Sequence, residues 1–167
     1  MLLSILIADP ISILAIESNK TIFNLALSES RNGDYKNALK RWNEFLDMFP
    51  NDGVALSNRG NVFLALGDVK QAIADQTRAI EILPEDIDPH LNRGIAEEAL
   101  QLWDEAVYDY QWILDREPNE SSALYNLANV MIAKQEWIEA QKLLGKASYT
   151  RPDFVIARSS KALITYQ

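Results

Sequence analysis

The peptide SNRGNVFLALGD, residues 57–68, has a counterpart in LNRGIAEEALQL, residues 91–102, because the tripeptide Asn-Arg-Gly recurs after 34 residues. Aligning the two stretches without a gap brings further residues into the same register. Recurrence at a fixed period of this length is typical of repeat architectures. The sequence therefore predicts a repeat protein. Three series follow the spacing: Ala38, Ala72, Ala106 and Ala140; Pro50, Pro84, Pro118 and Pro152; and Asn24, Asn58, Asn92 and Asn126.

Each unit contains two amphipathic helices by its apolar spacing. In the second unit the first helix carries Leu56, Gly60 and Phe63, and LGD at 66–68 turns the chain. The second helix ends before Pro84, which lacks the N–H that a helix interior needs. One such hairpin leaves an apolar flank bare, so neighbouring units must stack. We expect units at 19–52, 53–86, 87–120 and 121–154, followed by a terminal helix at 155–167.

Composition limits the classes of function. The chain of 167 residues is 48% hydrophobic, which is enough for one domain with a substantial core. Its net charge of -8 disfavours binding to nucleic acid or to anionic lipid. Cysteine is absent from the sequence, which excludes disulfides and thiolate metal sites.

Residues 1–18 form the most apolar run of the chain. A membrane span needs about 20 uninterrupted apolar residues, and a signal peptide needs a basic start. Asp9 and Pro10 interrupt this run, and the first positive charge is Lys20. Asp9 as N-cap and Pro10 at the first helical position instead predict an extra helix over the edge of the first unit. A cleaved or damaged targeting segment is the alternative. The residues expected to share one face are Ile11, Leu14, Ile22 and Leu25.

The units resemble the tetratricopeptide repeat family, whose pattern has small residues at positions 8 and 20, an aromatic residue near 11 or 17, and Pro at 32. The resemblance covers 19–167 and implies an all-α, right-handed solenoid of antiparallel helix pairs: four repeats plus a terminal helix. It also implies that the first helices line a concave, protein-binding groove. Position 8 holds Ala26, Gly60, Gly94 and Ala128, and position 17 holds Tyr35, Trp103 and Trp137.

Two further stretches, DPHLNRGIAEEAL and ALYNLANV, resemble a cyanobacterial and plastid subgroup of this family. In that subgroup the chain continues past the point where this one stops, which implies a shortened form. The subgroup also implies an assembly factor of a photosynthetic organism as one alternative function. A cytoplasmic or plastid stromal location is expected, with targeting through 1–18 left open.

The glycine and arginine of the tripeptide are expected to have structural roles. Gly60 and Gly94 lie where the two helices of a hairpin cross, and a missing side chain lets the backbones approach despite a helix cost of about 1 kcal/mol. Arginine at position 7 occurs only with aspartate at position 23, and the fourth unit replaces both with leucine. This pattern predicts ion pairs inside two hairpins, with an anion-binding role as the alternative. The predicted pairs are Arg59–Asp75 and Arg93–Asp109.

The asparagine recurs at position 6 of all four units, where the family resemblance places it in the groove. A carboxamide offers a donor and an acceptor, which match the C=O and N–H of a peptide backbone. We therefore expect a ladder that holds an extended or helical segment of a partner; tolerated, solvated asparagine is the alternative. The predicted groove residues are Asn24, Asn58, Asn61, Asn92, Asn126, Asn129, Tyr125, Leu91, Ile95, Asp88 and Glu98.

The partner is expected to be a protein or peptide, basic or amphipathic, because the unit at 87–120 holds -7 of the total charge. Some members of the family bind a C-terminal carboxylate with groove Lys and Arg; at positions 2, 5 and 6 only Lys20 is basic before the final helix, which argues against such a clamp. His90 falls at a packing position, and the adjacent acids Glu97 and Glu98 point in different directions. No nucleophile, phosphate-loop or metal-ligand motif is present, so we predict neither an enzyme nor a cofactor.

A structural or self-association module is the second class of function. It would pack through the exposed terminal helix, whose flank includes Leu163 and Ile164. The sequence is compatible with a monomer or a weak homodimer. A protein-binding scaffold and a self-association module differ in oligomeric state, which light scattering measures.

Overall fold

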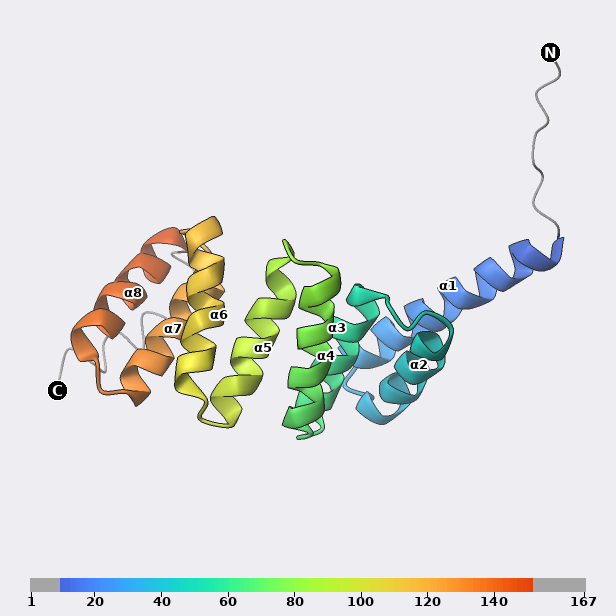
Figure 1. Ribbon diagram of the computed structural model, residues 1–167, viewed down its shortest axis with the longest axis horizontal. Helices are drawn as coiled ribbons and strands as arrows, with labels where there is room; N and C mark the ends of the chain where they lie inside the picture. Colours follow the sequence, from blue (N-terminus) through green and yellow to red (C-terminus); the bar gives the residue numbers. More distant parts are fainter. Residues whose placement is uncertain (1–9, 152–167) are drawn as a thin grey trace, which may run out of the picture.

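A computed structural model describes residues 10–151, in which the chain forms eight α-helices and no strand (Figure 1). Each predicted unit corresponds to one pair of helices joined by a tight turn, and the two helices of each pair pack together. The helices are α1 (Pro10–Arg31), α2 (Tyr35–Met48), α3 (Gly53–Ala65), α4 (Val69–Ile82), α5 (Ile87–Ala99), α6 (Trp103–Arg116), α7 (Ser121–Ala133) and α8 (Trp137–Thr150).

Helix α1 differs from the two separate helices expected at the N-terminal end. It begins at Pro10 and runs without a break across the predicted boundary between residues 18 and 19. Leu25 is 42% exposed, so it does not share a buried face with Ile22. No helix within 10–151 is long and apolar enough to cross a membrane. Asp9 and the predicted terminal helix at 155–167 lie outside the described residues.

The turns inside the pairs share one left-handed residue. Gly33 and Gly67 have φ of 78° and 84°, and Gln101 and Gln135 take the same place with φ of 58° and 62°. In the second unit the N–H of Asp68 donates to the carbonyl oxygen of Phe63 at 2.9 Å, which closes the helix end in the manner of a Schellman motif. The chain therefore reverses in the same way with glycine or with glutamine.

The starts of three first helices are capped by acids at the repeat spacing. Asp52, Asp86 and Glu120 precede α3, α5 and α7, and each accepts a hydrogen bond from a backbone N–H of the first turn. A carboxylate there satisfies an N–H that has no partner within the helix.

The pairs stack in one direction along the molecule (Figure 1). Each second helix packs against the following first helix, and successive first helices also contact one another, from α1 to α3, α3 to α5 and α5 to α7. The first helices therefore form a continuous layer. The recurring alanine of the second helices is buried in all four units: Ala38, Ala72, Ala106 and Ala140.

Candidate functional site

The candidate site is the layer made by the first helices α1, α3, α5 and α7, called the inner face below. All the residues predicted for the groove lie on these four helices. Asn24, Asn61 and Asp88 are exposed, and Ile95 is 37% exposed. The other predicted groove residues are half-buried, namely Asn58, Leu91, Asn92, Glu98, Tyr125, Asn126 and Asn129.

Two asparagines of the ladder donate hydrogen bonds within the protein. Asn58 donates from Nδ2 to the carbonyl oxygen of Val54 at 2.8 Å, one turn back along α3. Asn92 donates from Nδ2 to the Ser57 hydroxyl at 3.4 Å, which joins α5 to α3. The Asn126 side chain lowers the pKa of Tyr110, against the larger opposing effects of burial and of Glu98.

Asn61 has the opposite role. It accepts at Oδ1 from Nε2 of Gln76 at 3.0 Å, and the same Nε2 donates to the carbonyl oxygen of Ser57 at 2.9 Å. Gln76 lies on the second helix α4 and is 1% exposed. It reaches the inner face beside Gly60, where an added Cβ would come within 2.7 Å of Nε2. The glycine therefore makes room for a side chain of the second helix.

Tyr110 reaches the inner face in the third unit in the same way. Its ring lies beside Gly94, where an added Cβ would come within 2.6 Å of the ring. The hydroxyl donates to Oε1 of Glu98 at 2.5 Å. Burial raises the pKa of Tyr110, and the bond to Glu98 raises it further, so the group stays a phenol. Burial also raises the pKa of Glu98, and the bond from Tyr110 partly opposes this.

Sequence reasoning missed Gln76 and Tyr110 because both lie on second helices. Each stands 16 residues after a glycine of the Asn-Arg-Gly tripeptide. A long side chain at that spacing opposite a helix-crossing glycine is a signal that could have found them.

Acidic groups gather at one end of the inner face. Burial raises the pKa of Asp88, and the nearby charges of Asp86 and Glu120 raise it further. Two of these acids, Asp86 and Glu120, are also the caps of α5 and α7. The end of the inner face near these starts therefore carries negative potential.

The predicted ion pairs of the second and third units are confirmed. Arg59 binds Asp75 through Nε and Nη2 at 2.7 and 2.8 Å, and Arg93 binds Asp109 with the same two distances. Arg93 also donates from Nη1 to Thr77 at 3.2 Å, on the second helix of the preceding unit. These guanidinium groups join three helices and are engaged within the protein.

Around Asp109 the third unit buries several more polar groups. His90 lies 2.7 Å from Asp109 through Nδ1, is 4% exposed, and stacks on the Trp112 ring. Burial raises the pKa of Glu97 to about 7, helped by Asp109 and opposed by Arg93. Within residues 10–151 no group of three or more His, Cys, Asp or Glu is arranged to hold a metal ion.

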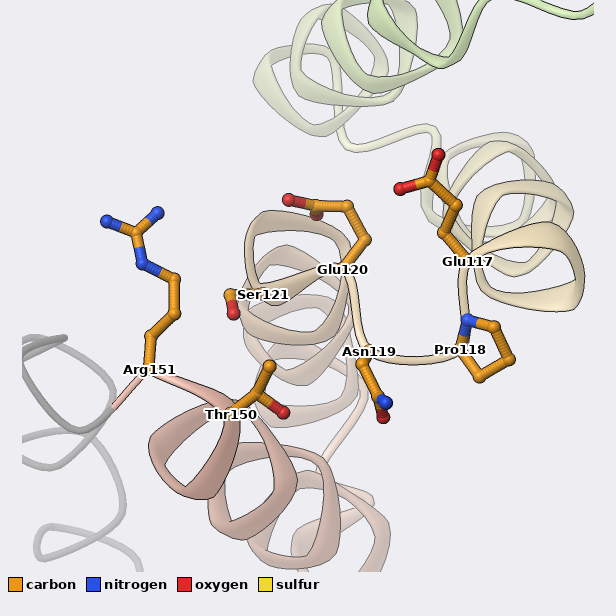
Figure 2. A pocket seen from close by; sticks show the side chains of 7 residues that line it. All are labelled: Glu117, Pro118, Asn119, Glu120, Ser121, Thr150 and Arg151. Carbon is orange, nitrogen blue, oxygen red and sulfur yellow. The ribbon is translucent and has the colours of Figure 1, made fainter.

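A separate pocket of about 470 Å³ lies at the turn between α6 and α7 and the end of α8 (Figure 2). Glu117 and Arg151 stand on opposite sides of it. None of the predicted groove residues, all of which the structure describes, lines this pocket. The residues that line it are Glu117, Pro118, Asn119, Glu120, Ser121, Thr150 and Arg151.

The chain is similar to proteins of the tetratricopeptide repeat family. The family's model matches residues 23–87. MamA from Desulfovibrio magneticus RS-1 superposes with a TM-score of 0.79 at 17% identity, over 89% of this chain and 84% of that one. A thermophilic tetratricopeptide repeat protein of Thermus thermophilus superposes with a TM-score of 0.77 at 19% identity, over 89% and 82%.

A third structure, the first tetratricopeptide repeat domain of Spaghetti, is bound to an HSP90 peptide; its TM-score is 0.67 at 24% identity, over 71% of this chain and 94% of that one. Among curated proteins, rat (Rattus norvegicus) serine/threonine-protein phosphatase 5 is 25% identical over 118 residues, which are 71% of this chain and 22% of the phosphatase. The zebrafish (Danio rerio) sperm-associated antigen 1A is 33% identical over 92 residues, 50% of this chain and 22% of the antigen. The chain thus spans about a fifth of the length of these two curated relatives.

Proposed function

We propose that the chain, which folds as a tetratricopeptide repeat solenoid, is a non-enzymatic scaffold that binds a segment of another protein on its inner face. The observation that carries the proposal is the asparagine at the same position of every first helix. These side chains lie at the surface layer of the molecule and fill no part of the apolar core clusters. A solved domain of the same fold bound to an HSP90 peptide supports a peptide as ligand.

The proposed ligand is a segment with basic or amphipathic character. Leu91, Ile95 and Tyr125 supply apolar surface between the polar groups, and Asp88 and Glu98 supply negative charge. A ligand that ends in a carboxylate would be repelled by these acids. At positions 2, 5 and 6 of α3, α5 and α7 no lysine or arginine is present to bind it. As an alternative we propose, from the stretches DPHLNRGIAEEAL and ALYNLANV, that the chain belongs to the cyanobacterial and plastid subgroup and is an assembly factor of a photosynthetic organism.

Affinity capture with the full chain, followed by mass spectrometry, would identify partners, and titration would test the site. We expect the triple change of Asn58, Asn92 and Asn126 to alanine to weaken a captured partner's binding far more than any single change. One hydrogen bond is worth about 1 kcal/mol net. Unaltered affinity in the triple variant would place the partner elsewhere on the molecule.

Self-association is the second candidate, and α8 carries the observation that favours it. Ile138 and Tyr149 are each 88% exposed and lie 11 residues apart, about three turns, on one side of the helix. The equivalent positions of the earlier second helices are all charged: Lys36, Lys70 and Asp104, and Asp47, Glu81 and Asp115. Light scattering on the wild type and on a variant with Ile138→Lys and Tyr149→Lys would test this. A monomer in both would reject self-association.

A further inference from the structure

We propose that the inner face accepts hydrogen bonds from its ligand, and that the ligand is a protein segment rich in donors, namely lysine or arginine side chains and unpaired backbone N–H groups. This inference rests on the proposed function and adds the chemical class of the ligand. It concerns the direction in which each carboxamide of the ladder is used.

The ladder asparagines of α3 and α5, Asn58 and Asn92, each use one N–H inside the protein. Asn58 donates to the Val54 carbonyl at 2.8 Å, and Asn92 donates to the Ser57 hydroxyl at 3.4 Å. A carboxamide has two N–H donors and one oxygen with two lone pairs. Each asparagine keeps its oxygen for the ligand and has one donor fewer, so the ladder acts mainly as a row of acceptors.

Tyr110 strengthens this polarity. Its hydroxyl hydrogen is used on Glu98, so the phenol offers the ligand no donor. Glu98 has a second carboxylate oxygen, and Asp88 is an exposed carboxylate on the same helix. These groups accept hydrogen bonds and attract cations.

Asn61 is the exception, because its oxygen accepts from Gln76 and its N–H groups remain for a ligand. It lies on α3, whereas Asp88 and Glu98 lie on α5. The donor-binding character is therefore strongest on α5, around Asn92, and we expect the cationic residues of the ligand to bind there.

The test uses a random library of twelve-residue peptides displayed on phage and selected against the full chain. The strongest peptides are then synthesised and titrated against Asn92→Asp and Asn92→Ala. Aspartate keeps an oxygen in the carboxamide's place and loses the N–H, and the Ser57 hydroxyl can donate to it instead. Asn119→Asp adds the same charge outside the inner face and is the matched control; thermal melting checks that each variant is folded.

We expect selected peptides to be enriched in lysine and arginine. Asn92→Ala should weaken binding by about fivefold, whereas Asn92→Asp should preserve or tighten it and Asn119→Asp should leave it unchanged. Enrichment in aspartate and glutamate, or equal losses in Asn92→Asp and Asn92→Ala, would overturn the inference and leave the scaffold function intact. If no peptide is selected, or binding ignores the triple alanine variant, the proposed function fails and the inference with it.

Discussion

At the residue scale, the buried charges of the two central hairpins form pairs with different surroundings. The Asp75 carboxylate receives both of its hydrogen bonds from Arg59. Asp109 receives the equivalent two from Arg93 and is also bonded to His90. Removing one member of a buried pair leaves an uncompensated charge, while replacing both with apolar residues is often tolerated.

This difference gives the first prediction. Asp75→Ala should lower the free energy of unfolding by about 3 kcal/mol or less, since Arg59 retains some contact with water. Changing Arg59 and Asp75 together to leucine, as the fourth unit already has with Leu127 and Leu143, should recover much of that loss. Urea denaturation measures both.

Changing Arg93 and Asp109 together to leucine should recover less of the lost free energy of unfolding. This double change also removes the partner of His90 and the cation nearest Glu97. Equal losses in the single and double variants of the second unit would contradict the pairing energetics.

A second residue-scale prediction concerns Glu97, whose Oε2 is buried without a hydrogen-bond partner. Its pKa is raised from 4.5 to about 7, so the fold favours the protonated form. Stability should therefore fall as pH rises from about 4.5 to about 7 and level off above. Glu97→Gln removes this contribution.

Urea denaturation at pH 5 and pH 8 should show the gap. At pH 8 the free energy of unfolding of the glutamine variant should exceed that of the wild type by on the order of 2 kcal/mol, after allowance for solvent screening. At pH 5 the difference should be much smaller. Asp88 and Glu98 also have raised pKa values, and they contribute equally to both proteins. The same difference between variant and wild type at both pH values would refute the assignment.

At the element scale, the turns within the helix pairs use a left-handed residue in four independent copies. Gly67 has φ of 84°, and an added Cβ there would meet no atom within 4 Å. Gln101 holds the same conformation with a side chain. Any effect of a change at these positions therefore reports backbone conformation with little steric interference.

The third prediction follows from this. Gly67→Ala should lower the melting temperature and reduce the free energy of unfolding by about 1 kcal/mol, because a residue with a side chain is disfavoured in the left-handed region. Gln101→Gly should relieve that strain, offset in part by the greater freedom of glycine in the unfolded chain. Gly33→Ala is a second instance of the same change and should show a similar loss, since Gly33 too has open space and φ of 78°. Differential scanning calorimetry measures all three, and a stabilised Gly67→Ala would contradict the argument.

At the scale of the whole molecule, charge is distributed unevenly along the solenoid. The third unit carries -7 of the net -8, and Asp88 and Glu98 present part of it on the inner face. Charge complementarity affects association rate, salt dependence and choice of partner more than it affects affinity at high salt.

The fourth prediction is that reversing Asp88 and Glu98 to lysine slows association with a basic partner and removes much of its salt dependence. Asp47→Lys combined with Glu81→Lys makes the same change of charge on the exposed surfaces of α2 and α4 and should have a small effect. Stopped-flow measurements compare the association rates of the variants at about 0.05 M and 0.15 M salt. The Debye length is near 10 Å in this range. Equal effects would show that net charge alone controls binding.

Residue spacing predicted the helix pairs and the ends of the second helices before the prolines. Spacing and the family resemblance together predicted the pairing of arginine with aspartate. These features depend on spacings within one unit of 34 residues, where local chain geometry dictates which side chains meet. The four asparagines of the ladder were placed on the first helices for the same reason. Their periodicity assigns them to one layer.

How those asparagines are used depends on the packing of one helix against another. Asn92 bonds a serine 35 residues earlier, and Tyr110 reaches Glu98 from another helix past Gly94. The pKa of Glu97 is likewise raised by burial and by the charges of Asp109 and Glu105 on α6. A hydrogen bond's direction and a carboxylate's desolvation are set by neighbours that packing supplies, and a pattern of residue types along the chain does not specify those neighbours.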